Sequence, residues 1–185
     1  MALTHTPVPD IGRPCPDFSL PGTDGREHSR AELSGADASL VMFICNHCPY
    51  VKAIEDRLIE LANDFKGQAL KMVAINANDA ENYPDDSFPA MKARAEMKSY
   101  PFPYLFDESQ EVARAFDAVC TPDFFLYDKT LKLAYRGRLD DSWKDPNAVT
   151  SRELKTAIEA LLAGRRPSSE QKSSMGCNIK WRKTK

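Results

Sequence analysis

Two cysteines, Cys45 and Cys48, are separated by two residues and lie between a short apolar run and a helical apolar pattern. This spacing lets two sulfurs close a small disulfide ring with little backbone movement. A helix start also offers unpaired N–H groups and the positive end of the helix dipole, which both stabilise a thiolate. We therefore predict a reversible dithiol–disulfide pair, in which Cys45 attacks and Cys48 resolves the mixed disulfide.

His47 lies between the two cysteines, where an imidazolium would favour the Cys45 thiolate. A solvated surface side chain is the alternative interpretation. The C-x-x-C pattern is also half of a common zinc site, but the chain has no second C-x-x-C or His pair. A copper or zinc carrier using Cys45, Cys48 and His47 stays open as an alternative, to be completed by one of the other cysteines, Cys15, Cys120 or Cys177.

The chain of 185 residues has five cysteines, and an odd number argues against a disulfide scaffold. The N-terminus lacks the basic and apolar regions of a secretory signal, so we expect a cytoplasmic protein. Cys120 and Cys177 are candidate additional redox residues, with a small buried apolar side chain as the alternative for Cys120. Cys15, between two prolines, is expected to be inert.

The net charge of -2 gives no general basic field for nucleic acid or an anionic membrane. No apolar run approaches the roughly 20 residues of a transmembrane helix. Residues 165–185 hold seven basic residues against one acidic residue, Glu170. We expect this tail to fold back onto the acidic remainder of the chain.

The apolar periodicity predicts the elements that must position the cysteines. Continuous apolar runs predict buried strands at 40–44, 70–75 and 104–106, and a β-hairpin joins 124–127 to 131–135. Helical spacing predicts helices over 51–65, 87–99, 110–116 and 153–162, the last two with capping boxes at Asp107/Gln110 and Thr150/Glu153. Asp79, Asp123 and Asp140 are expected at the surface or in turns. The order predicts an α/β sandwich whose sheet is parallel first and ends in an antiparallel hairpin.

A C-x-x-C after a buried strand, followed by Thr121-Pro122 ahead of the hairpin, resembles the thioredoxin-fold superfamily. Pro122 stands at a strand start, where a cis X–Pro bond is expected. The segment 12–25 resembles the entry of the peroxiredoxin-like, or redoxin, branch, and further similar segments are 43–51, 75–79, 120–125, 135–142 and 176–181. The resemblance implies an α/β thioredoxin-like fold, with a mixed central sheet flanked by helices, an N-terminal β-hairpin extension and a C-terminal tail. The implied division is an arm over 1–9, a domain over 10–164 and a basic tail over 165–185 that packs on the domain.

The resemblance also implies roles for individual residues. Cys45 and Cys48 match the redox pair, and Thr121-Pro122 matches the cis-proline loop that binds an extended substrate segment by strand addition. His47 stands where a strongly oxidising relative also has His, which implies a more oxidising pair than that of thioredoxin. In peroxiredoxins, the peroxidatic cysteine has a proline seven residues before it and a threonine or serine three residues before it. Here these two positions hold Val41 and Cys45 before Cys48, and Ala38 and Met42 before Cys45, so neither cysteine has this pattern.

The leading interpretation is a thiol–disulfide oxidoreductase with Cys45, Cys48 and His47 as catalytic residues. Its expected partners are protein or small-molecule disulfides and an unidentified thiol reductant. We expect no cofactor, no metal, no nucleic acid and no membrane, and a monomer or homodimer. A metal-binding thioredoxin-fold carrier and an atypical thiol peroxidase of the peroxiredoxin-like group are the alternatives.

Overall fold

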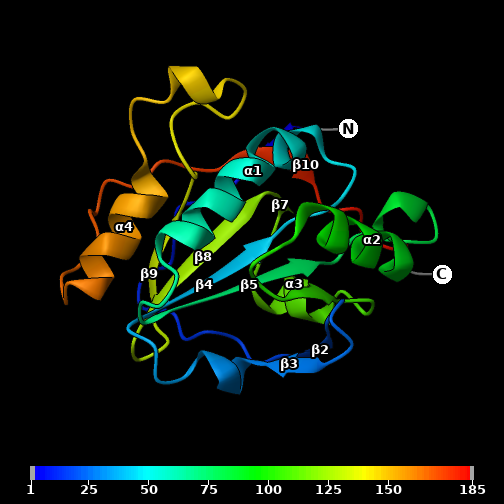
Figure 1. Cartoon of the computed structure of the whole chain (residues 1–185), viewed down its shortest axis with the longest axis horizontal. Coiled ribbons are helices and arrows are strands. Elements are labelled where there is room, and N and C mark those ends of the chain that lie inside the picture. The colour runs from blue at the N-terminus through cyan, green and yellow to red at the C-terminus, as the bar shows by residue number, and fades with distance from the viewer. Residues whose placement is uncertain (1–2, 184–185) are drawn as a thin grey trace.

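The computed structural model describes residues 3–183, and a five-stranded sheet runs through its centre (Figure 1). The strand order is β6 (Tyr104–Phe106), β5 (Leu70–Asn76), β4 (Ala38–Phe43), β8 (Asp123–Asp128) and β9 (Leu133–Gly137). β4, β5 and β6 are parallel, whereas β8 pairs antiparallel with both β4 and β9. The predicted mixed sheet, parallel first and ending in a hairpin, is confirmed.

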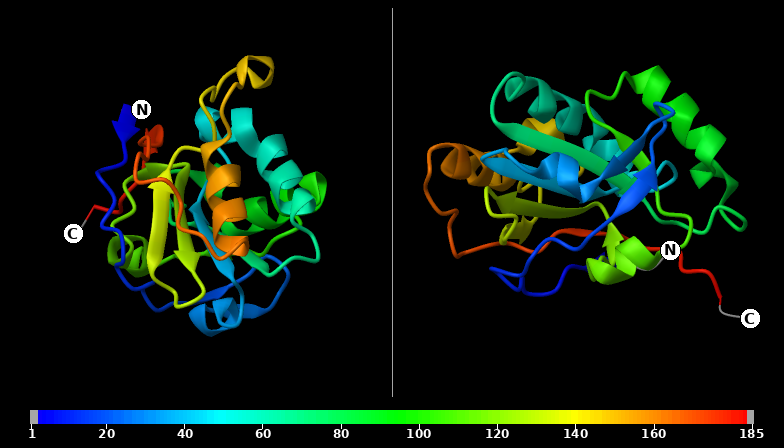
Figure 2. Two further views of the ribbon diagram at one scale, coloured as in Figure 1. Left: turned by 90° about the vertical axis from the view of Figure 1, so that its left-hand side faces the viewer. Right: turned by 90° about the horizontal axis from the view of Figure 1, so that it is seen from below.

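Both faces of this sheet are covered, which explains why the apolar run in β4 is uninterrupted. Leu40 and Met42 belong to a core shared with α1 (Pro49–Asp64), α2 (Phe88–Lys98) and α4 (Glu153–Leu162). Val41 and Phe43 point to a second core with α3 (Glu111–Ala115) and the N-terminal segment that contains β2 (Ser19–Pro21) and β3 (Glu27–Ser29). Figure 2 shows α1, α2 and α4 together on one side of the sheet. Three short 3-10 helices complete the elements, at Arg30–Leu33, Pro84–Asp86 and Pro146–Ala148.

A second, three-stranded sheet brings the two ends of the described chain together. β10 (Met175–Asn178) lies between β1 (Leu3–His5) and β7 (Cys120–Thr121), and it is antiparallel to both. Figure 2 shows the first and last strands side by side. None of these three short strands follows from the sequence pattern. The division of the chain at residues 10 and 164 stays a prediction.

Neither predicted capping box forms as a reciprocal pair, although Asp107 caps α3 by accepting the Ala113 N–H at 2.8 Å. Gln110 has a φ of 65° at the N-cap of α3, and its amide donates to the carbonyl oxygens of Ala77 and Lys180 at 2.6 and 2.9 Å. At α4, Arg152 is the N-cap, whereas Glu153 accepts from Arg138. Thr150 instead donates to the carboxylate of Asp141.

The three aspartates expected at the surface or in turns are buried, but two of them cap turns as expected: Asp79 accepts the Glu81 N–H at 3.2 Å, and Asp140 accepts the Ser142 N–H at 3.1 Å. Asp123 forms an ion pair with Arg136 at 2.8 Å, and Asp140 pairs with Arg57. Asp79 accepts the side-chain amide of Asn82 at 2.5 Å. Within residues 3–183, no helix is both long enough and apolar enough to cross a membrane.

Candidate redox site

The loop that leaves β4 carries both cysteines of the C-x-x-C motif into the core. Cys48 is the N-cap of α1, and Pro49 is its first residue. An N–H at this position has no hydrogen-bond partner within the helix, so a proline there costs no hydrogen bond. Cys45 lies three residues before this N-cap and is therefore outside the helix. Both side chains are free thiols, with exposed fractions of 2% for Cys45 and 0% for Cys48.

The loop that contains Thr121 and Pro122 faces both cysteines. The Thr121–Pro122 peptide bond is cis, as the sequence predicts. The Thr121 hydroxyl oxygen lies 3.3 Å from the Cys45 sulfur, and the Cys48 thiol donates to the Thr121 carbonyl oxygen at 3.1 Å. The structure therefore brings Cys45 into contact with Thr121, 76 positions away along the chain.

The two thiols share a hydrogen bond, so that they lose their protons as a coupled pair. The bond from Cys45 lowers the pKa of Cys48 below that of an ordinary thiol, and the Val51 N–H in the first turn of α1 acts in the same direction. Burial raises the pKa of Cys45, and the bond to Cys48 and the Asp86 charge raise it further. The first thiolate is therefore expected on Cys48, whereas the sequence predicts that the helix activates Cys45.

Asp86, the last residue of the 3-10 helix Pro84–Asp86, is a fully buried carboxylate at this site. It accepts from the Asn46 N–H at 2.7 Å, the Asn78 amide at 2.8 Å and Nδ1 of His47 at 2.5 Å. Burial acts to raise the pKa of Asp86, but these hydrogen bonds outweigh it and hold the pKa below its ordinary value. Asp86 therefore stays ionised inside the protein, next to the redox pair.

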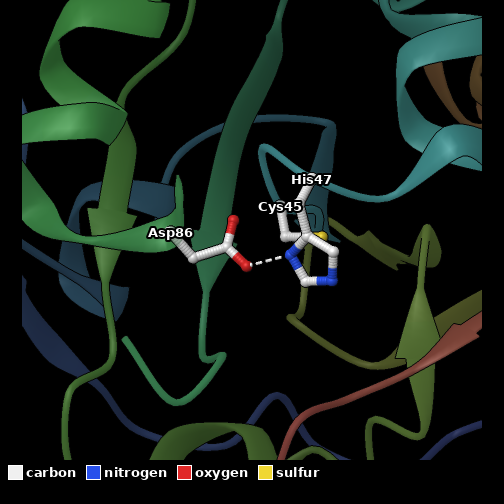
Figure 3. Close-up of side chains that lie close together, drawn as sticks. All are labelled: Cys45, His47 and Asp86. Atoms are coloured by element: carbon white, nitrogen blue, oxygen red, sulfur yellow. Dashed lines mark hydrogen bonds and ion pairs between the residues drawn. The ribbon is translucent and has the colours of Figure 1, made fainter. Parts of the chain in front are cut away.

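His47 is held by Asp86 on one side and by an aromatic ring on the other. Its ring stacks on Tyr83 with 5.2 Å between centroids and an angle of 14° between planes. Its Nε2 atom is buried and has no hydrogen-bond partner among the described residues. Figure 3 shows Cys45, His47 and Asp86 close together, and one ligand atom from each lies within 4.8 Å of the others. A thiolate, an imidazole and a carboxylate form a donor set suited to zinc or a similar metal.

Asparagine and tyrosine side chains fix the loops around Asp86. Asn46 donates to the Asp85 carbonyl oxygen at 2.7 Å and accepts from the Tyr104 hydroxyl at 3.1 Å. Asn76, at the carboxyl end of β5, donates to Asp86 at 3.3 Å. The polar residues that follow this strand are the sequence signal for such a polar cluster, because the carboxyl ends of parallel strands lie at the same edge of a sheet.

A cavity of about 380 Å³ lies beside the cis-proline loop. Pro122, Tyr50 and Trp143 line it, with 4.3 Å between the centroids of the two aromatic rings. The buried Arg57 of α1 fixes the loop that carries Trp143, because it donates to the Ser142 and Trp143 carbonyl oxygens, each at 2.9 Å. A larger cavity of about 620 Å³ lies between the β2–β3 region and the end of α1, and no cysteine lines it. No cysteine lines the smaller cavity either, but its lining includes Pro122 of the cis-proline loop, whose neighbour Thr121 contacts both redox cysteines.

The remaining three cysteines are all buried. Cys177, in β10, lies opposite Thr121, and burial raises its pKa, as does its hydrogen bond with Cys48. Cys120 donates weakly to the Pro122 carbonyl oxygen at 3.6 Å, and burial raises its pKa. Burial also raises the pKa of Cys15 to about 12. Among these three, only Cys177 hydrogen-bonds to the redox pair.

A C-x-x-C pair between a strand and a helix, facing a cis-proline on a mixed sheet, defines a thioredoxin-fold protein of the redoxin type. Residues 11–136 match the model of the AhpC/TSA family, and the chain belongs to this family. No curated protein matches the chain at a significant level.

Solved structures of whole chains resemble this protein closely. An uncharacterized conserved protein from Geobacillus kaustophilus is 45% identical, with a TM-score of 0.94 over 100% of this chain and 99% of that one. A hypothetical protein from Sinorhizobium meliloti is 41% identical, with a TM-score of 0.92 over 97% of this chain and 98% of that one. A thiol:disulfide interchange protein of the thioredoxin family from Chlorobium tepidum is 18% identical, with a TM-score of 0.60 over 82% and 94%. This last similarity concerns the fold alone.

Proposed function

We propose that the protein is a thiol–disulfide oxidoreductase whose reaction centre is the Cys45/Cys48 pair. The observation that carries the proposal is that both sulfurs contact Thr121 in the cis-proline loop, Cys45 at 3.3 Å and Cys48 at 3.1 Å. The loop orients both sulfurs, and the lowered pKa of Cys48 lets its thiolate act as base while Cys45 attacks.

The reaction proceeds in two exchange steps. The Cys45 sulfur, which has the larger exposed fraction, attacks one sulfur of a substrate disulfide and gives its proton to the Cys48 thiolate. The substrate disulfide breaks, and its second sulfur leaves as a thiolate. Cys48 then gives its proton to the first substrate thiolate and attacks Cys45, which forms the Cys45–Cys48 disulfide and releases the second substrate thiolate. The substrate gains two electrons, and a thiol reductant returns them to the pair by the reverse steps.

The surroundings of the pair favour protein or small-molecule disulfides as substrates. The cavity beside Pro122 offers two aromatic rings and polar backbone to a group carried next to the reacting sulfur. The lowered pKa of Cys48 stabilises the reduced form, which makes a disulfide more oxidising. We expect a reduction potential above the roughly -270 mV of thioredoxin.

Thiol trapping across a series of glutathione redox potentials tests the proposal. The protein is alkylated without reduction at each potential, and its disulfides are mapped by mass spectrometry. We expect a Cys45–Cys48 disulfide in the native chain and in Cys15→Ser, the matched control, and no such bond in Cys45→Ser or Cys48→Ser. Absence of the bond at every potential contradicts the proposal. Hydrogen peroxide is assayed in parallel, since its steady consumption with a reductant would favour the peroxidase alternative.

Metal binding is the second candidate function, favoured by the cluster of Cys45, His47 and Asp86, in which one ligand atom of each lies within 4.8 Å of the others. A fourth ligand from Cys48 or water would complete a tetrahedral site. Titration of the reduced, untagged protein with Zn²⁺ tests it by calorimetry. Stoichiometric binding that is lost in Asp86→Asn and kept in Cys120→Ser would support the carrier function. Equal binding by both variants would exclude this site.

A further inference from the structure

The C-terminal strand β10 occupies the edge of the cis-proline loop, next to both reacting sulfurs. Cys177 pairs with Thr121 and Asn178 with Cys120, in antiparallel register. Strand addition is a common way for a protein to bind an extended peptide, with main-chain hydrogen bonds for affinity and side-chain contacts for specificity. Here the added strand belongs to the same chain.

Gly176 allows this strand to approach the loop unusually closely. A Cβ atom at residue 176 would lie 2.0 Å from the carbonyl oxygen of Thr121 and 2.6 Å from its carbonyl carbon. Both are backbone atoms, so no side-chain movement can make room. Only glycine fits here, and it sets Cys177 directly against the loop that contacts Cys45 and Cys48.

The register directs the Cys177 side chain to the redox pair. Residues directly opposite each other in an antiparallel ladder project to the same face. The Thr121 hydroxyl contacts Cys45, so the face shared by Thr121 and Cys177 is the one that holds the pair. Cys177 is 2% exposed and packs in the same core as Cys45 and Cys48. Cys120, next to Thr121 in the strand, projects to the opposite face.

Contacts on both sides of Cys177 hold this arrangement in place. The Ser174 hydroxyl donates to the Pro122 carbonyl oxygen at 3.0 Å, and β1 pairs along the outer edge of β10. Beyond the strand, the Lys180 N–H donates to Asn78 at 2.8 Å, and its carbonyl oxygen accepts the Asp79 N–H at 2.9 Å. The tail is thus fastened before and after the cysteine.

We propose that β10 is an internal substrate strand and that Cys177 is a third redox residue, which exchanges disulfides with Cys48. This step rests on the proposed function, which supplies the Cys45–Cys48 disulfide. The Cys177 thiolate attacks the Cys48 sulfur of that bond. The Cys48–Cys177 bond forms, the Cys45–Cys48 bond breaks, and Cys45 leaves as a thiolate that takes up the proton lost by Cys177. No external oxidant is consumed in this exchange, and Cys45 becomes free to attack a second substrate disulfide.

Disulfide mapping in two single variants of the full chain tests the proposal. Cys45→Ser and Cys177→Ser are oxidised with glutathione disulfide, alkylated and mapped by mass spectrometry. In Cys45→Ser we expect a Cys48–Cys177 disulfide, which is detected because neither Cys48 nor Cys177 is alkylated. Cys120→Ser is the matched control, because it removes one cysteine but keeps Cys45, Cys48 and Cys177. A glutathione adduct on Cys48 with an alkylated Cys177, or a Cys120–Cys177 bond, overturns the proposal.

Cys177→Ser tests the proposed function by itself, because only a Cys45–Cys48 bond can form there at the redox centre. Absence of that bond counts against the oxidoreductase function, whereas its presence with no Cys48–Cys177 bond in Cys45→Ser counts against the third redox residue alone. If Cys45→Ser does not fold, the native chain gives the answer across a series of glutathione ratios. We expect both the Cys45–Cys48 and the Cys48–Cys177 disulfide, and their proportion to each other should not change with the glutathione ratio. Detection of the Cys45–Cys48 disulfide alone at every ratio overturns the proposal.

Discussion

The hydrogen bond between Cys45 and Cys48 acts in opposite directions on their two pKa values, and it makes Cys48 the more acidic thiol. Cys48 takes the N-cap of α1 and accepts the N–H of Val51, whereas Cys45 lies near the Asp86 carboxylate. The negative charge is therefore expected on Cys48. Cys45 remains a thiol until a substrate approaches, and this arrangement limits reaction with reagents that cannot enter the site.

We expect Cys45→Ala to raise the pKa of Cys48, because the substitution removes the hydrogen bond that lowers it most. A hydrogen bond to a charged group contributes about 1.5–3 kcal/mol, so the rise should be ~1–2 pH units. The rate of Cys48 alkylation by iodoacetamide as a function of pH measures this midpoint. Cys15→Ala, which removes a thiol outside the site, should leave the midpoint unchanged. An unchanged midpoint in Cys45→Ala would contradict the hydrogen bond between the two thiols.

The sequence predicts the residues whose chemistry is local and misses the one that acts across the fold. The spacing of Cys45 and Cys48 and the proline after Thr121 are visible patterns. Asp86 belongs to a polar stretch 40 residues beyond Asn46, where an acidic residue before a helix has a simpler explanation as a cap. Its burial depends on four donors from two loops, and no local pattern contains that information.

The loop that carries Trp143 is the element best placed to select substrates. Because Trp143 lines the cavity beside Pro122, we expect Trp143→Ala to raise KM for a protein disulfide about tenfold, the equivalent of ~1.4 kcal/mol. Steady-state kinetics with a glutathione-coupled assay measures this. Trp181→Ala removes the other tryptophan, which packs under Arg114 away from the cavity, and should leave KM unchanged. Equal KM values for both variants would show that the cavity does not bind substrate.

Helices α1 and α2 are joined by a buried carboxylate on α1. Glu55 accepts two hydrogen bonds from Arg94 at 2.6 and 2.8 Å and one from the Tyr100 hydroxyl. Burial acts to raise the pKa of Glu55, but these hydrogen bonds outweigh it, so the pKa is lower in the folded state than its ordinary value. The stabilisation is therefore fully present above the unfolded pKa of roughly 4.3 and is lost as the pH falls through the folded pKa.

We expect Glu55→Gln to lower the free energy of unfolding by about 2–3 kcal/mol at pH 7, since it removes a charged partner from a buried network. The difference from the native chain should shrink below pH 4 or so, where Glu55 itself becomes protonated. Urea unfolding at several pH values measures both effects. Asp56→Asn, on the exposed neighbour that pairs only with Lys98, should cost under about 0.5 kcal/mol. A pH-independent loss in Glu55→Gln would contradict an ionised Glu55.

The longer elements follow from periodicity, and the shorter ones do not. The apolar runs of β4 and β5 and the helical spacing of α1 are strong local patterns. β7 has two residues and β10 four, with glycine and asparagine among them, so neither shows alternation. β7 and β10 form strands because β10 pairs with both β7 and β1, which are far away along the chain. The sequence carries no local signal for this long-range pairing.

At the scale of the whole molecule, the first and last described strands, β1 and β10, pair with each other next to the cis-proline loop. β1 and β10 cover the cis-proline loop, and the basic tail then runs over the polar loop after β5, where Lys180 binds Asn78. The described tail therefore connects the redox pair to the Asp86 network through Cys177 on one side and Asn78 on the other. A substitution in the tail should therefore change the reactivity of the thiols.

Gly176→Ala tests this connection, because a Cβ atom 2.0 Å from the Thr121 carbonyl oxygen must push β10 away from β7. We expect a loss of about 1–3 kcal/mol in the free energy of unfolding, typical of overpacking, and faster alkylation of Cys48 as its cover lifts. Urea unfolding and peptide mapping after timed alkylation measure the two effects. Ser173→Ala, on an exposed neighbour in the tail, should change neither. If Gly176→Ala is destabilised but Cys48 reacts no faster, the tail supports the fold without covering the redox pair.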